Sequence, residues 1–158
     1  MAVIDKSVLV RELCKRLETI QGSDGVAIVY PGEPIPGDAV LCLRVDSIQL
    51  DRQVRGATQG DANADFGRLR MVLWGWVNQT KTLEKGAYAA AALEAKVAAA
   101  FRDWGTEADS HVVEVNGFRS TMGEGQIGDK TFVGEQIVVE GNVWRHGSSG
   151  LQAINPLA

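Results

Sequence analysis

The chain of 158 residues contains 45% hydrophobic and 23% charged residues, the proportions of an ordinary globular domain, and its length favours one domain over two. At this size roughly two-thirds of the surface of the unfolded chain is buried on folding, so neither a metal nor a disulfide framework is required. The formal charge is −4 and acidic and basic residues are interspersed. This pattern excludes the basic stripe of an ordinary nucleic-acid-binding domain.

The N-terminus carries no basic segment followed by a long apolar stretch, so it does not resemble a signal peptide. No window approaches the roughly 18 apolar residues that a membrane span requires. We therefore expect a protein made and kept in the cytoplasm, without a membrane partner. Cys14 and Cys42 both lie in apolar patterns. We expect buried, reduced thiols, with a disulfide between them as the alternative.

The first predicted element is an amphipathic helix over residues 5–21, where apolar residues recur at spacings of three and four. A short run rich in β-branched residues predicts a strand over 26–30, and the proline-rich stretch 31–38 predicts an irregular connection. Period-two alternation predicts one long or bent strand over 39–50. Residues 51–67 contain three glycines and almost no large apolar side chain, which predicts a long exposed loop.

The middle of the chain contains the clearest strand and the clearest helix. Over residues 68–78, Leu69, Met71 and Leu73 point to one face, and arginines and tryptophans point to the other. Over residues 83–104, large apolar side chains recur at helical spacing within an alanine-rich sequence. Alanine favours helix intrinsically and lets the helix backbone approach a sheet closely.

The last part of the chain predicts strands separated by glycine-rich turns. Residues 111–115 predict a strand, and Asn116-Gly117 is a strong two-residue turn signal that makes a hairpin plausible there. A glycine-rich stretch over 122–129 leads to a final long strand over about 131–145.

This order of elements predicts an α+β fold. We expect a mostly antiparallel or mixed β-sheet with two helices packed on one face, and long exposed loops. Residues 1–146 are expected to form a single domain, and residues 147–158 a flexible C-terminal tail, because their sequence is small and polar with isolated apolar residues.

Two phosphate-binding patterns occur, and neither has the required context. Gly123, Gly125 and Gly128 match the G-x-G-x-x-G spacing, but the motif leads into a predicted strand rather than a helix whose N-terminus would meet a pyrophosphate. In the following Gly128-Asp129-Lys130-Thr131, the aspartate would repel a phosphate. We interpret the stretch as a turn, and keep a small nucleotide-binding enzyme domain as the weakest functional alternative.

Other catalytic and metal-binding patterns are missing from the sequence. Neither His111 nor His146 has a second ligand at metal spacing, and neither cysteine is part of a metal or nucleophile motif. Asp51, Asp61 and Asp65 cluster in the predicted loop and could serve a hydrolase or a cation site. A flexible loop is a poor scaffold for such chemistry, so we interpret them as solvated. We expect no enzyme activity and no cofactor.

Three tryptophans are the candidates for a contact surface. Trp74 and Trp76 share one face of a predicted strand, with Trp144 on the last strand expected near them. Because apolar residues of the same strand occupy the opposite face, these rings must be covered by something. An interface with another chain and a second core layer both explain the pattern.

Four stretches resemble the tail terminator, or minor tail protein U-like, family of long-tailed bacteriophages. They are Arg68-Leu-Arg-Met-Val-Leu-Trp-Gly-Trp-Val-Asn, the helix from Ala89 to Arg102, the strand from Glu135 to Arg145, and the N-terminal helix around Val8 to Leu17. The likeness is one of pattern and order over most of the chain. The proline-rich segment before Ala39 and the glycine-rich stretch before Thr131 depart from the pattern.

The resemblance implies a structural virion protein of the tail or neck, assembled in the cytoplasm of a bacterial host. Such a protein forms a ring, usually a hexamer, that caps the tail tube and possesses no catalytic residues. Its partners would be copies of itself, the tail tube and sheath proteins, and a head-completion or connector protein. DNA would pass through the lumen without specific binding, which the acidic balance permits.

The candidate interface residues lie on two predicted strands and in the predicted loop. They are Trp74, Trp76, Trp144, Arg52, Arg55, Asp61 and Asp65. The loop and the C-terminal tail are expected to order on docking. A head-tail connector or a baseplate component is the main functional alternative, because such proteins share the head-to-tail ring geometry.

Overall fold

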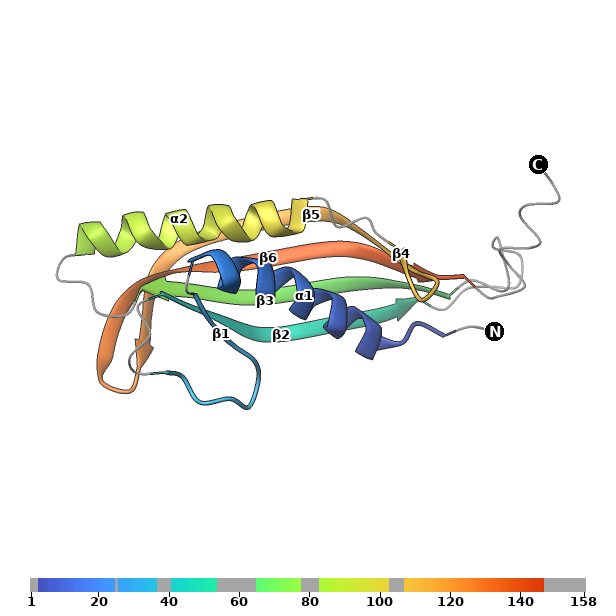
Figure 1. Ribbon diagram of the computed structural model, residues 1–158, viewed down its shortest axis with the longest axis horizontal. Helices are drawn as coiled ribbons and strands as arrows, with labels where there is room; N and C mark the ends of the chain where they lie inside the picture. The colour runs from blue at the N-terminus through green and yellow to red at the C-terminus, as the bar shows by residue number, and fades with distance from the viewer. Residues whose placement is uncertain are drawn as a thin grey trace.

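The computed structural model describes residues 3–24, 26–36, 41–53, 65–77, 83–102 and 107–146. These residues form two helices and six strands (Figure 1). In chain order the elements are α1 (Lys6–Asp24), β1 (Ala27–Val29), β2 (Leu41–Gln53), β3 (Asp65–Val77), α2 (Leu83–Arg102), β4 (Glu107–Ala108), β5 (His111–Ile127) and β6 (Lys130–Arg145).

The six strands form one mixed sheet in the order β1-β2-β3-β6-β5-β4. Every neighbouring pair is antiparallel except β1 and β2, which are parallel. The central pair, β3 and β6, stays in register from Asp65 opposite Arg145 to Trp76 opposite Gly134. The α+β prediction of a mostly antiparallel sheet is therefore confirmed.

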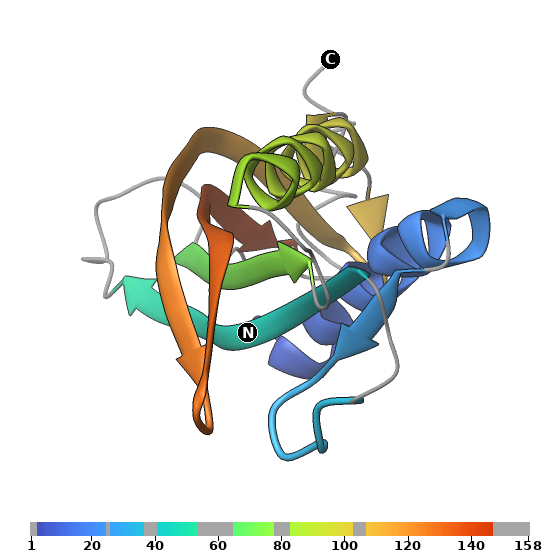
Figure 2. The same ribbon diagram turned by 90° about the vertical axis from the view of Figure 1, so that its left-hand side faces the viewer.

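Both helices cover one face of the sheet, here called the inner face, as predicted (Figures 1 and 2). Helix α1 contacts β1 and α2, and α2 contacts β3, β5 and β6. Arg16 of α1 donates a hydrogen bond to the carbonyl of Ala100 at the end of α2, 2.9 Å away. Because α1 and α2 also share buried apolar side chains, the helices and the sheet have one core.

The core combines the helical and the strand periodicities read from the sequence. Each large apolar side chain that reaches it is withdrawn from water, a gain of about 25 cal/mol per Å² of apolar surface. The helices contribute Leu9, Leu13, Leu17, Leu93, Val97 and Phe101, and the sheet contributes Leu43, Val45, Leu69, Met71, Leu73, Ile137, Val139 and Val143.

Two sequence predictions about loops are wrong. Asn116-Gly117 does not form a hairpin turn, because β5 continues through it and the register with β6 shifts between Val115 and Gly117, as in a β-bulge. The predicted loop over 51–67 is shorter at both ends. Gln53 pairs with Phe66, so residues 51–53 and 65–67 belong to paired strands; residues 54–64 lie outside the described residues.

The glycine-rich stretch that matched a phosphate-binding motif forms a β-hairpin. Gly123 and Gly125 lie in β5, and the turn between β5 and β6 consists of Gly128 and Asp129. Gly128 has a φ of +63°, which suits glycine at the first position of a two-residue hairpin turn. The end of this hairpin curves away from the helices toward the opposite, outer face of the sheet (Figure 2).

Candidate interaction surfaces

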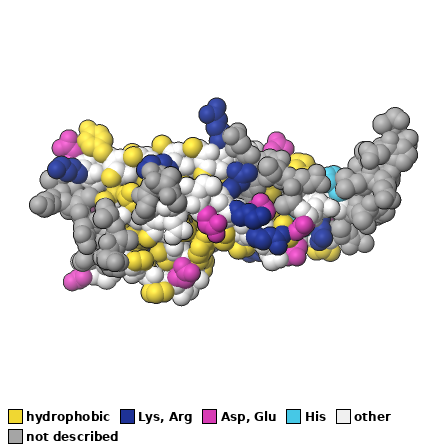
Figure 3. Space-filling view, viewed as in Figure 1, with side chains coloured by type: hydrophobic (Ala, Val, Ile, Leu, Met, Phe, Trp, Pro, Cys, Tyr) yellow, Lys and Arg dark blue, Asp and Glu magenta, His cyan; other side chains and the backbone are white. Residues whose placement is uncertain are grey.

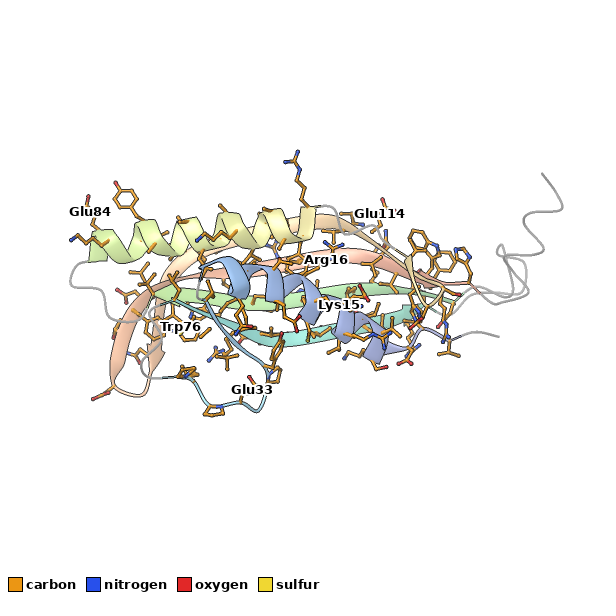
Figure 4. All side chains as sticks on the ribbon, viewed as in Figure 1. Lys15, Arg16, Glu33, Trp76, Glu84 and Glu114 are labelled. Atoms are coloured by element: carbon orange, nitrogen blue, oxygen red, sulfur yellow. The ribbon has the colours of Figure 1, made fainter. Side chains whose placement is uncertain are left out.

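The predicted contact residue Trp76 is covered by its own chain. Its side chain lies on the outer face and is 1% exposed, and its ring stacks on Phe132 with the centroids 5.3 Å apart. Phe132 lies on the curved end of the β5–β6 hairpin, which covers the end of the sheet where Figure 4 places Trp76 and Glu84. The prediction that Trp76 is available for another chain is therefore wrong. Of the two explanations offered for the tryptophans, an interface or a second core layer, the second core layer applies to Trp76.

Trp74 supports the same hairpin through glycines. A Cβ atom built on Gly125 would lie 2.7 Å from Cζ2 of Trp74, and one built on Gly134 would lie 2.9 Å from it. Glycine at both positions lets the hairpin backbone lie directly on the indole ring. The half-buried Trp74 thus packs within the chain, and it shares with Trp76 the role of holding the hairpin in its curve.

Trp144 belongs to the other end of the outer face, which corrects the expectation that it lies near Trp74. Trp74 pairs with Gln136 and Phe66 with Trp144, so eight residues of β6, about 26 Å, separate the two tryptophans. The Trp144 ring stacks on Phe66 at 6.1 Å and its Nε1 donates to Nε2 of His146 at 3.2 Å. Trp144 is half-buried.

Arg52 and Asp65, two further candidate interface residues, bind the segment that precedes α1. The carboxylate of Asp65 accepts a hydrogen bond from the backbone N–H of Ile4 at 2.8 Å and lies 3.3 Å from Nη1 of Arg52. Arg52 Nη2 donates to the carbonyl of Ile4, also at 2.8 Å. These two side chains therefore serve the fold, while Arg55 and Asp61 lie outside the described residues.

His111 and Arg145 complete this N-terminal anchor from β5 and β6. His111 is 1% exposed, and its Nε2 accepts from the N–H of Asp5 at 2.8 Å. Its Nδ1 lies 2.9 Å from the carbonyl of Asp109, so the neutral ring with the proton on Nδ1 satisfies both contacts. Arg145 Nη1 donates to the carbonyl of Val3 at 2.6 Å. The sequence offered no signal for this cluster beyond polar residues at strand ends.

The central part of the outer face is polar and carries both signs of charge. Arg70 and Glu140 approach to 3.6 Å with both side chains about half exposed, so their ion pair adds little stability. A hollow of about 370 Å³ is lined there by Asp51, Arg68, Leu69, Arg70, Asn116, Glu140, Gly141 and Asn142. Mixed charges of this kind do not select an anion or a cation.

An apolar groove lies where α2 leaves the edge strand β5 uncovered on the inner face. The groove has a volume of about 520 Å³ and is lined by Glu94, Ala95, Ala98, Ala99, Phe101, Arg102, Val115 and Phe118. Phe118 is 37% exposed, and Met122, on the same face of β5, is 43% exposed. We call this feature the α2–β5 groove. Sequence reasoning missed it because the turn predicted at Asn116-Gly117 would end the strand before Phe118.

Beside this groove lies a buried carboxylate without a full set of partners. Glu135 is 7% exposed, and its Oε2 has no hydrogen-bond partner. Burial, and to a lesser degree the nearby carboxylate of Glu94, raise the pKa of Glu135 above its ordinary value. Glu135 pairs with Met122 across the β5–β6 ladder, and Glu94 lines the groove, so the two acids lie at one end of it.

The remaining chemistry is sparse. Cys14 and Cys42 are both free thiols, and burial raises the pKa of Cys42, which disfavours its reactive thiolate. Within the described ranges, no group of three or more His, Cys, Asp or Glu side chains could hold a metal ion. Neither α1 nor α2, the two described helices, is apolar enough over a sufficient length to cross a membrane.

No family model matches the chain, and no curated protein matches it in sequence.

The packing of the hairpin on Trp74 predicts a position-specific effect of alanine. A Cβ on Gly134 would lie 2.8 Å from the carbonyl oxygen of Gly75 as well as against Trp74, so Gly134→Ala should lower the free energy of unfolding by about 1–3 kcal/mol. Gly123, its partner across the ladder, has nothing within 4 Å of its Cβ position, and Gly123→Ala is the matched control. Urea unfolding measures both; equal effects would contradict the packing.

The N-terminal anchor predicts that two aspartate-to-alanine variants differ in stability. Asp65→Ala leaves the N–H of Ile4 and Nη1 of Arg52 without their acceptor, so it should cost about 1–3 kcal/mol of unfolding free energy and speed hydrogen exchange at the start of α1. The control Asp46→Ala breaks the exposed pair with Arg44 and should cost less than about 1 kcal/mol. An Asp65→Ala protein as stable as the control would show that the anchor carries no stability.

The raised pKa of Glu135 predicts a pH dependence. Because the folded protein holds this proton more tightly than the unfolded chain does, Glu135 lowers stability as the pH rises above the ordinary glutamate value of about 4.3. Glu135→Gln removes the titration, so its stability relative to the wild type should increase between pH 4 and 7. Chemical unfolding across this range measures the difference, and a difference that stays constant with pH would contradict the prediction.

Proposed function

We propose that the protein is a structural subunit of a bacteriophage tail terminator, which caps the tail tube as a ring of identical copies and joins it to the head-completion proteins. The observation that carries this proposal is a sheet with two unsatisfied edges. Within the described residues, β2 pairs with no strand on its side away from β3 over residues 45–53. Likewise, β5 pairs with no strand on its side away from β6 over residues 113–127. A long unpaired edge is a template for pairing with another chain.

The arrangement of the family-like stretches supports the same proposal. Three of them fall on β3, α2 and β6, and α2 packs on both strands. The fourth falls on α1, which packs beside α2 on the same face. The stretches that carry the resemblance therefore form the contiguous centre of the molecule.

The proposed partners follow from that role: copies of this chain, the tail tube with its sheath, and a connector protein. The outer face carries mixed charges and no described basic stripe, which suits a lumen wall that DNA passes without binding. A virion location in the tail or neck is part of the same proposal, as is the absence of a catalytic role.

Tail-tube assembly tests the proposal directly. Tube protein should be polymerised in vitro with increasing amounts of this protein, and tube lengths measured by negative-stain electron microscopy. A terminator shortens the tubes in proportion to its concentration and labels one tube end. Tubes of unchanged length would overturn the terminator role, and binding to a connector complex under those conditions would favour the connector alternative.

A further inference from the structure

We infer that the α2–β5 groove and the free edge of β5 form one half of a head-to-tail interface whose other half is the β2 edge and α1 of a second copy of this chain. The inference rests on the proposed function and names the surfaces by which its ring would close. Strand directions, apolar complementarity, charge and an incomplete buried site support it.

The first observation is the directions of the two free edges. From β2 through β3 and β6 to β5, three successive antiparallel pairs give β2 and β5 opposite directions within one sheet. When the β5 edge of one copy meets the β2 edge of the next, the two strands are antiparallel and both copies keep their helices on the same face. Each added copy presents the same free edge again, which is the heterologous geometry that gives a ring when the rotation between successive copies closes.

The apolar side chains at the two edges complement each other. The β5 side presents the α2–β5 groove, which is lined by small alanines of α2. The exposed side chains of Phe118 and Met122 lie beside these alanines on β5. The β2 side offers Ile48 and Leu50, which are only half-buried against the core on the inner face. Edge pairing would bring these inner-face side chains into one continuous apolar layer.

The charges at the two surfaces are opposite. On the inner face, strand β5, the groove lining and Glu135 together carry three acidic side chains (Glu94, Glu124, Glu135) and one basic side chain (Arg102). Helix α1 carries four basic side chains (Lys6, Arg11, Lys15, Arg16) and two acidic side chains that are described (Glu12, Glu18). Within one copy Arg11 pairs with Asp109 and Lys15 with Glu12, both at the surface, and Arg16 donates to the carbonyl of Ala100. Figure 3 shows Lys and Arg side chains gathered over the part of the surface that α1 forms. Complementary patches of this kind steer association and set register.

The buried site at the groove is incomplete in a single copy. Oε2 of Glu135 is buried without a partner, and Glu94 stands beside it at the groove. None of the ion pairs among the described residues involves either carboxylate. A basic side chain of a neighbouring α1 supplies the missing cation at this end of the groove, and a buried charge without such a partner is costly.

The first test measures self-association of the full chain by sedimentation velocity over a range of concentrations. Phe118→Lys places a charge on the apolar groove and should weaken association by roughly tenfold or more. Tyr88→Lys is the matched control, because Tyr88 is 71% exposed on α2 and does not line the groove. A wild-type protein that stays monomeric at every concentration, or equal losses in both variants, would overturn the inference.

A charge-reversal pair distinguishes the head-to-tail arrangement from other contacts. Glu94→Lys and Lys15→Glu should each associate less tightly than the wild type, since each places like charges at its own interface. An equimolar mixture should recover association, because the altered groove then meets the altered α1. No recovery would contradict the pairing of groove and α1, and thermal unfolding of each variant checks that it is folded.

The result of these self-association measurements is independent of the result of the tube assay. Tubes that are shortened by a protein whose association ignores these substitutions would leave the terminator role standing and overturn the interface. Association that follows the substitutions, in a protein without effect on tube length, would establish the interface and remove the terminator role.

Discussion

The register between β3 and β6 is the constraint on which the rest of the structure depends. Because side chains alternate along a strand, this one alignment places Leu73 and Ile137 together under the helices and at the same time places Trp74 and Gln136 on the outer face. A slip of one residue would move every core side chain to the wrong face. Both helices, both edge strands and the curved hairpin are positioned from this central pair.

Contacts within the chain hold both ends of the outer face. At one end the hairpin curves back over Trp74 and Trp76, and glycines at 125 and 134 make that approach possible. At the other end Asp65, His111 and Arg145, from three different strands, bind the backbone that precedes α1. The described candidates for an external contact surface, Trp74, Trp76, Trp144, Arg52 and Asp65, thus make contacts within the chain, and free backbone remains at the edges of the sheet.

The free edges of β2 and β5 differ from the rest of the sheet because, among the described residues, their backbone hydrogen-bonding groups face no partner strand. Strands β2 and β5 each contain a bulge, at Asp46 and Asn116, features that distort an edge and limit indiscriminate pairing. Beside β5, exposed Phe118 and Met122 and the orphaned carboxylate oxygen of Glu135 lie within one region. Apolar exposure and an unpartnered buried carboxyl oxygen in the same place are a stronger sign of an intended partner than either alone.

The sequence by itself determined the fold class, both helices, the strands β1, β2, β3 and β6, and the inner-face positions of their apolar side chains, because those follow from local periodicity; strand β5 was predicted only over its first five residues. Tertiary structure decided the rest. Asn116-Gly117 became a bulge because β6 is long enough to pair on both sides of it, and residues 51–53 and 65–67 became strand because they could pair with each other. Contacts between residues far apart in the chain, which no local pattern encodes, decide the burial of Trp76 and the roles of Arg52 and Asp65. They also decide the incomplete site at Glu135.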